Sequence, residues 1–247
     1  FFFSWYRDHR ALHSSPTRRS SDLDFYRHHS RQYAQVSEEF RQSVYLKSSH
    51  RALNNDWDAW ERLKQLIHGK RGLDAGCGAG ARDVFHAWSE GYDVVGIDAI
   101  EENIKVAGEL HPEIAERGFV ADLAQDLPFE SESFDFVMCN AVIQHIEPEV
   151  VQDVVLPELA RVLRPGGVLQ LMFKNGNGIL TLFDNDYGVE RNFQLYDESD
   201  LLQVLQRHGM RIIEADSPDQ LGGVLYLTDG KGVDHGLFFT RKERANP

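Results

Sequence analysis

The run Gly72-Leu73-Asp74-Ala75-Gly76-Cys77-Gly78-Ala79-Gly80 decides the fold of this chain. A short apolar stretch that ends in a carboxylate and passes into alternating glycines predicts a buried strand, a tight turn and the start of a helix. The three glycines of the turn carry no side chains to block a ligand's approach to the backbone, and Asp74 places a carboxylate at the strand end. The run therefore indicates an α/β fold that binds a nucleotide-like ligand.

A second acid and the glycine spacing indicate which kind of ligand. Asp98 closes the apolar run 93–97, where a carboxylate is able to accept both hydroxyls of a ribose. The dinucleotide fingerprint is G-x-G-x-x-G, whose helix N-terminus holds a pyrophosphate, whereas this turn reads G-x-G-x-G with an acid upstream. An acid beside the ligand disfavours a pyrophosphate and favours a ligand with an amino group and a positive centre.

At these acids and glycines the chain resembles the class I S-adenosylmethionine-dependent methyltransferases, whose first motif is an acid with a glycine loop and whose second is the ribose-binding acid. The resemblance continues over roughly residues 70–174, through Ala121-Asp122-Leu123, the run 134–140 and Leu163-Arg164-Pro165-Gly166-Gly167. It implies an α/β fold with a Rossmann-like, doubly wound sheet of about seven strands, mostly parallel, with an antiparallel strand in a C-terminal hairpin. It also implies S-adenosyl-L-methionine as the cofactor, with these binding residues: Asp74, Ala75, Gly76, Cys77, Gly78, Gly80, Asp98, Ala99, Ile100, Asp122, Leu123, Asn140 and Ala141.

The composition of the 247 residues bounds the class of protein. A net charge of −13 does not attract phosphate backbones by bulk charge, although a local basic patch is compatible with it. Two cysteines are too few for a disulfide framework, and no run of about eighteen apolar residues indicates a membrane span. None of the eleven histidines forms H-E-x-x-H and neither cysteine belongs to C-x-x-C, so no metal site is expected. We expect a cytoplasmic protein without a membrane anchor.

Three segments are expected along the chain. Residues 1–23 have neither helical nor strand periodicity, carry four arginines against two aspartates, and include 13–22, which closely resembles a translated sequencing adapter. We therefore interpret 1–23 as a non-native tail, with a basic targeting peptide as the alternative. Residues 24–67 predict a helical cap over the ligand, and 68–243 the cofactor-binding methyltransferase domain.

The alternation of elements predicts the sheet. Strands ending near Asp74, Asp98, Val120, Cys139 and Phe173 alternate with helices, which implies parallel strands with right-handed crossovers. Further expectations are a helix from about 149 to the Pro165-Gly166 stop, a long loop over 174–195 that acts as a lid or specificity element, a helix over 197–208, and two final strands, 210–215 and 236–240.

The leading functional hypothesis is methyl transfer to a small-molecule acceptor by in-line displacement, in which positioning supplies most of the acceleration. His145 follows the fourth strand and is the candidate catalytic base, although a histidine there more often has a structural or substrate-lining role. Five aromatic residues are candidates to cover a positive sulfonium or the acceptor, although their helical spacing more often means core packing: Tyr26, Tyr33, Tyr45, Trp57 and Trp60.

Three alternatives stay open. Local likeness at 39–45 and 163–178 favours an enzyme resembling the bacterial transfer RNA carboxymethoxyuridine methyltransferase, against which the acidic charge counts. A nicotinamide-dependent oxidoreductase on a similar sheet would bind NAD, and a noncatalytic module would bind the cofactor alone. The acceptor and the oligomeric state do not follow from the sequence.

Overall fold

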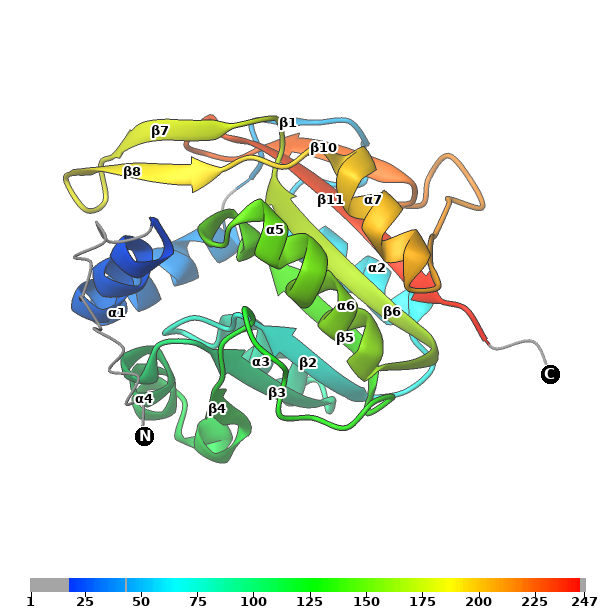
Figure 1. The fold of residues 1–247 in the computed structure, drawn as a ribbon, viewed down its shortest axis with the longest axis horizontal. Helices are drawn as coiled ribbons and strands as arrows, with labels where there is room; N and C mark the ends of the chain where they lie inside the picture. Colours follow the sequence, from blue (N-terminus) through cyan, green and yellow to red (C-terminus); the bar gives the residue numbers. More distant parts are fainter. Residues whose placement is uncertain (1–17, 43, 245–247) are drawn as a thin grey trace, which may run out of the picture.

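The computed structural model describes residues 18–42 and 44–244, which form one large β-sheet with helices on both faces (Figure 1). One face is covered by α2 (Asp56–Leu66), α3 (Arg82–Ser89) and α4 (Glu101–Leu110). The other is covered by α7 (Glu198–Arg207) and by a helical run of α5 (Pro148–Val150), a π-helical turn (Val151–Val155) and α6 (Leu156–Val162). These three layers confirm the predicted Rossmann-like α/β fold.

The strand order is β1-β10-β11-β6-β5-β2-β3-β4, and β9 pairs with β11 beside β10. The strands from β4 to β6 pair in parallel, whereas β11 runs antiparallel between β6 and β10. The mostly parallel sheet with an antiparallel C-terminal strand is thus confirmed, and the short β1 and β9 add to the expected seven. The bounds are β1 (Lys47–Ser48), β2 (Arg71–Ala75), β3 (Asp93–Asp98), β4 (Gly118–Val120), β5 (Phe134–Asn140), β6 (Leu163–Lys174), β9 (Met210–Ile212), β10 (Val224–Thr228) and β11 (Asp234–Lys242).

Alternation along each strand supplies both layers of the core. In β5, Val137 and Cys139 pack toward α6 and α7, while Phe136 and Met138 pack toward α2 and α3. Because both faces are covered, the central strands are nearly continuous apolar runs. Polar side chains appear where parallel strands end, as Asn140 does in β5. The carboxyl edge of the sheet is therefore the place for a binding site.

The segment before the core sheet is mainly helical, and it also contributes the edge strand β1. Figure 1 shows α1 (Arg18–Gln42) beside α4 at one end of the sheet. The N-cap residue of α2 is Asn55, whose side chain accepts hydrogen bonds from the backbone N–H groups of Trp57 and Asp58. Of the predicted tail, residues 1–17 lie outside the described residues and 18–23 are the start of α1, so the division at residue 24 stays a prediction.

The expected loop over 174–195 is instead an antiparallel hairpin. β7 (Ile179–Asp184) and β8 (Val189–Gln194) form a separate two-stranded sheet, joined by a turn that ends at Gly188 with φ 68°. Most of the Gly, Asn and Asp residues that favoured a loop lie in the turns at the ends of these strands. The hairpin contacts α1, since Gln32 Nε2 donates to the carbonyl of Asp186 at 2.5 Å.

Two other element predictions are wrong at their boundaries. The helical run ends at Val162 rather than at Pro165, because Leu163 already pairs with Phe134 as the first residue of β6. The predicted strand 210–215 stops at Ile212, and on the edge of β11 away from β6 the longer partner is β10, which the sequence analysis missed. β9 and β10 occupy consecutive register positions along β11, with Ile212 opposite Thr240 and Val224 opposite Phe238. They act as one strand that is interrupted by the excursion 213–223.

No helix within the described ranges is long and apolar enough to cross a membrane.

Candidate active site

The glycine turn after β2 adopts a backbone that side chains would prevent. Gly76 and Gly78 have φ angles of 99° and 65°, which are unfavourable for residues with a Cβ. A Cβ at Gly76 would lie 2.4 Å from Val142 Cγ2, and one at Gly78 would lie 2.7 Å from the Tyr33 ring. The N–H groups of Gly76 and Cys77 both donate to the carbonyl of Ile97 at 2.9 Å, which ties the turn to β3. The turn is therefore fixed against its neighbours from both sides.

Asp98 lies at the end of β3 beside a cavity of about 90 Å³. Its Oδ2 accepts from the N–H of Gly78 at 3.0 Å, and its Oδ1 accepts from the N–H of Ile100 at 2.9 Å and from Asn103 Nδ2 at 3.1 Å. Burial raises the pKa of Asp98, against the lowering effect of these three hydrogen bonds. A carboxylate offers about four acceptor positions, so one remains for a ligand hydroxyl. Apolar side chains complete the small cavity, among them Ile97, Ala99, Ile100, Ala121, Leu123 and Val142.

A second cavity of about 230 Å³ extends from the glycine turn under α1, α2 and the hairpin. Both cavities are lined by Gly76, Ala141, Tyr26, Tyr33 and His145, so they meet where β2 and β5 end. A ligand in the small cavity is thus able to present one end to a second molecule in the large cavity.

Most of the residues predicted from the sequence reach these cavities, and three do not. Ala75 is buried in the core, Gly80 packs near Ser37 Oγ of α1, and Asp122 accepts a hydrogen bond from the N–H of Ala124 and contacts Arg19. The others divide between the cavities: Asp74, Gly76, Cys77, Asn140 and Ala141 line the large one, and Gly76, Gly78, Asp98, Ala99, Ile100, Leu123 and Ala141 line the small one.

The large cavity has a partly buried charge network on the side of β2. Arg82 pairs with Asp56 at 2.9 Å and with Asp83 at 2.8 Å. Burial raises the pKa of Asp83, but the charge and hydrogen bonds of Arg82 outweigh it and lower that pKa below its ordinary value. For Asp74 burial dominates, and with the nearby charge of Asp83 it raises the pKa well above the usual range. Tyr45 closes the network by donating to Asp56 at 2.6 Å.

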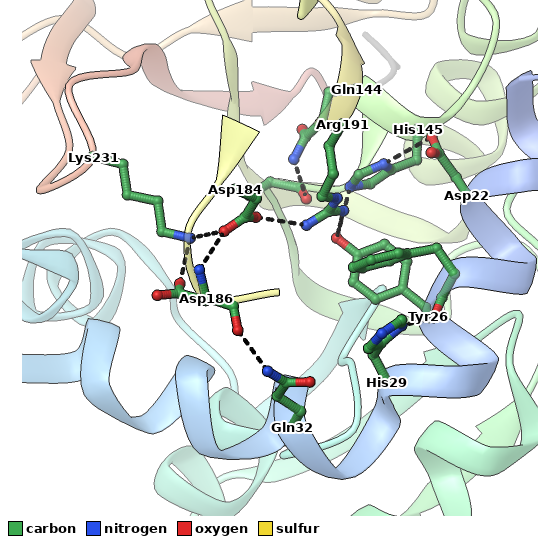
Figure 2. Close-up of polar contacts among 12 residues, drawn as sticks. Asp22, Tyr26, His29, Gln32, Gln144, His145, Asp184, Asp186, Arg191 and Lys231 are labelled. Atoms are coloured by element: carbon green, nitrogen blue, oxygen red, sulfur yellow. Dashed lines mark hydrogen bonds and ion pairs between the residues drawn. The ribbon is translucent and has the colours of Figure 1, made fainter. Parts of the chain in front are cut away.

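His145 lies on the short 3₁₀ turn Ile143–His145 after β5, with its ring toward α1 (Figure 2). Its Nε2 is 3.2 Å from the Tyr26 hydroxyl and its Nδ1 is 3.2 Å from Asp22. Burial lowers the pKa of His145, although Asp22 opposes this effect. A neutral imidazole at neutral pH is competent to accept a proton. Asp22 belongs to residues 1–23, which the sequence predicts to be a non-native tail.

The sequence analysis missed a cluster of charged and aromatic residues on the hairpin. Arg191 pairs with Asp184 at 3.2 Å and donates from Nη2 to the Tyr26 hydroxyl at 2.6 Å (Figure 2). Its guanidinium also lies 4.3 Å from the Phe25 ring centroid and 4.8 Å from that of Phe193. The cluster joins α1 to the hairpin over the large cavity. No sequence motif identifies this cluster. The only sequence features that could have indicated it are Asp184 and Arg191, which lie in a segment that alternates apolar and polar residues.

Among residues 18–42 and 44–244, no group of three or more His, Cys, Asp and Glu side chains is arranged to hold a metal ion.

Comparisons with known proteins agree with this geometry. The family described as "Methyltransferase domain" matches residues 73–171. An uncharacterized methyltransferase of Synechocystis sp. is 30% identical over 151 residues, which cover 59% of this chain and 68% of that protein. A fatty-acid O-methyltransferase of Mycolicibacterium smegmatis is 40% identical over 102 residues, 41% of this chain and 36% of its own length. The chain thus spans about a third of the length of that second relative.

Solved structures share the fold at low identity. The 1,6-didemethyltoxoflavin-N1-methyltransferase of Burkholderia thailandensis, solved with 1,6-didemethyltoxoflavin and S-adenosylhomocysteine, has a TM-score of 0.64 at 16% identity, covering 95% of this chain and 93% of that one. The [4+2]-cyclase SpnF has a TM-score of 0.62 at 15% identity, covering 92% and 97%. These likenesses show the fold alone, and the cyclase illustrates that one fold serves more than one reaction.

The family match lies on the strands and turns that form the two cavities, and the Synechocystis relative is covered over more than two thirds of its length. The chain therefore belongs to the class I S-adenosylmethionine-dependent methyltransferases and uses S-adenosylmethionine as its cofactor.

Proposed function

We propose that this enzyme transfers the methyl group to a small-molecule acceptor by in-line displacement. The observation that carries the proposal is the meeting of the small and large cavities at Gly76, Ala141 and His145. The family membership removes the nicotinamide-dependent oxidoreductase alternative. It leaves the acceptor open, because relatives named for different substrates share the domain.

The residues around the small cavity fit the adenosine half of the cofactor. Asp98 has an acceptor position left for a ribose hydroxyl, and Leu123 and Ile100 supply apolar walls for a base. The methionine half would extend past Gly76 toward Asp74 and Asn140 in the large cavity. We therefore assign cofactor binding to these residues together with Cys77, Gly78, Ala99 and Ala141. Ala75, Gly80 and Asp122 are assigned supporting roles in the turn and the adjoining loop.

The cofactor supplies an electrophilic methyl group on a positively charged sulfur. The rings of Tyr26 and Tyr33 line both cavities, where aromatic faces stabilise a positive centre and exclude water. The Tyr26 hydroxyl accepts from Arg191 and donates to His145 Nε2. We propose that the Tyr26 hydroxyl accepts the proton that an O–H or N–H acceptor loses and passes its own proton to His145 Nε2, which is the unprotonated ring nitrogen before the reaction.

A transfer RNA acceptor, the alternative drawn from the sequence, has less support. Relatives whose names state a substrate act on molecules such as 2-methyl-6-phytyl-1,4-hydroquinone or fatty acids. The net charge of −13 also opposes binding to a phosphate backbone. A cytoplasmic location stays a prediction from the cysteine content.

The test is methyl transfer from radiolabelled S-adenosylmethionine to a panel of phenols, amines and acids, and to total transfer RNA. The full chain and residues 24–247 are assayed with Asp98→Ala and with Asp126→Ala as the matched control, since Asp126 is exposed and lies outside both cavities. Label in a small molecule that is lost only in Asp98→Ala supports the proposal. Label that enters transfer RNA alone, with a steep decrease at higher salt, contradicts it.

A further inference from the structure

Lys174 is a buried amine at the far end of the large cavity. It is the last residue of β6, its side chain lies on the same sheet face as those of Gln170 and Met172, and the residue is 8% exposed. It lies opposite His235 of β11, and its Nζ is 3.4 Å from His235 Nε2. His235 Nδ1 is 3.1 Å from the carbonyl of Val233 and donates to it, so Nε2 is the free acceptor for Lys174. A lysine is rarely buried without a charged partner, and such a site calls for one.

The other charges at this end of the cavity already have partners. Arg191 pairs with Asp184, and Lys231 pairs with Asp184 at 2.8 Å and with Asp186 (Figure 2). Asp229 Oδ1 accepts from the N–H groups of Lys231 and Val233 at 2.9 Å, and its Oδ2 lies 3.9 Å from His235 Nε2. Within the described ranges, Lys174 Nζ forms no ion pair, and its one hydrogen bond goes to His235.

Burial lowers the pKa of Lys174 to about 8, although Asp229 opposes this effect, while Arg191 and Lys231 add to it. Burial also lowers the pKa of His235 to about 4, and the charge of Lys174 contributes. At neutral pH the pair therefore carries one positive charge, on Lys174.

The cavity around Lys174 has apolar walls beside these charged residues. Its Nζ lies 4.7 Å from the centroid of the Phe193 ring, and Met172, Leu182, Leu227 and Val233 line the same cavity. The hydroxyl of Tyr187, also on this cavity, is buried and has no hydrogen-bond partner among the described residues. A single cation beside an aromatic ring and aliphatic side chains matches a single carboxylate on a hydrocarbon or aryl body better than a doubly charged phosphate.

We propose that Lys174, with His235 behind it, binds a carboxylate of the methyl acceptor, and that the acceptor is an organic acid with an apolar body. β6 lies two strand spacings from β2, roughly 10 Å across the sheet, so this carboxylate is an anchor and the group that receives the methyl lies nearer the glycine turn. This inference rests on the proposed function and specifies its substrate class.

The experiment measures ligand binding to the full chain saturated with S-adenosylhomocysteine. The probes are 3-phenylpropionate, 4-phenylbutyrate and octanoate, each compared with its primary amide by titration calorimetry. The variants are Lys174→Met, Lys174→Arg and, as a control with the same change of charge, Lys105→Met, because Lys105 is exposed on α4 and lines neither cavity.

The inference expects at least one acid to bind at least tenfold more tightly than its amide, a difference of about 1.4 kcal/mol. Lys174→Met removes that preference, Lys174→Arg keeps part of it, and Lys105→Met leaves it unchanged. All variants keep the wild-type affinity for S-adenosylhomocysteine. If Lys174→Met fails to fold, the comparison of wild type, Lys174→Arg and His235→Leu decides, and His235→Leu is expected to weaken the acid preference.

Three results overturn the inference. The first is that the wild type binds the acids and their amides equally tightly, or binds neither. The second is an unchanged acid preference in Lys174→Met. The third is loss of S-adenosylhomocysteine binding in Lys174→Met alone, which would assign Lys174 to the carboxylate of the cofactor. Failure of the wild type to bind S-adenosylhomocysteine at all contradicts the cofactor site instead, and so is distinguishable.

Discussion

Replacement of Gly76 by alanine tests whether the turn after β2 is fixed by both backbone and space. The φ angle of 99° costs a residue with a Cβ roughly 1–3 kcal/mol. The new Cβ would also lie 2.4 Å from Val142 Cγ2, and overpacking of this kind costs about 1–3 kcal/mol. We expect Gly76→Ala to lower the free energy of unfolding by about 2–6 kcal/mol and to lower the affinity for S-adenosylhomocysteine at least tenfold, because the turn borders both cavities.

Two further variants separate the contributions. Gly188 in the hairpin turn has φ 68° and no atom within 4 Å of a built Cβ, so Gly188→Ala measures the backbone cost alone, about 1–2 kcal/mol. In the double variant Gly76→Ala/Val142→Ala the clash is relieved and the backbone cost remains. Urea unfolding followed by circular dichroism gives the free energies, and calorimetry gives the affinity. If Gly76→Ala is no less stable than Gly188→Ala and binds S-adenosylhomocysteine as tightly as the wild type, the contact with Val142 does not fix the turn.

Three other predictions concern the large cavity. Arg82→Met leaves the partly buried Asp83 without its cation and is expected to cost about 1–3 kcal/mol at neutral pH. Because Arg82 lowers the pKa of Asp83 in the folded protein, this stabilisation is present above the unfolded pKa and decreases as pH falls, which urea unfolding at pH 7 and pH 4 measures. The folded-state pKa of His235, about 4, lies below its unfolded value, so the unfolded chain binds more protons below about pH 6.5. The stability of the wild type is therefore expected to decrease from about pH 6.5 toward pH 4. His235→Leu is expected to flatten that part of the profile of melting temperature against pH. His145→Gln is expected to lower the rate of methyl transfer to an O–H or N–H acceptor about 10²- to 10⁴-fold while the affinity for S-adenosylhomocysteine, measured by calorimetry, stays at the wild-type value; an unchanged rate would remove His145 from the chemistry.

The sheet and its cofactor edge were predictable from local pattern. Asp74 and Asp98 each end an apolar run, and the glycines that follow Asp74 are typical of a tight turn. The residues of the cofactor site therefore directly follow the strands in the sequence. Parallel strands covered on both faces also produce the apolar runs that identify them.

The acceptor end was not predictable, because it depends on contacts between distant segments. β10 escaped notice because the excursion 213–223 separates it from β9, although both extend one line along β11. Lys174 reads in sequence as the polar end of an apolar strand, and only its pairing with His235, across the sheet, makes it a buried amine on a cavity. Asp184 and Arg191 likewise meet Tyr26 only in the folded chain.

We expect Asp98 and the glycine turn to bind S-adenosylmethionine. Titration calorimetry of residues 24–247 with S-adenosylhomocysteine and with NAD, repeated for Asp98→Ala, measures this binding. S-adenosylhomocysteine is expected to bind, NAD is not, and Asp98→Ala is expected to abolish binding in a protein that is still folded by circular dichroism. A folded wild type that fails to bind S-adenosylhomocysteine, or that prefers NAD, would show that these residues do not form the cofactor site.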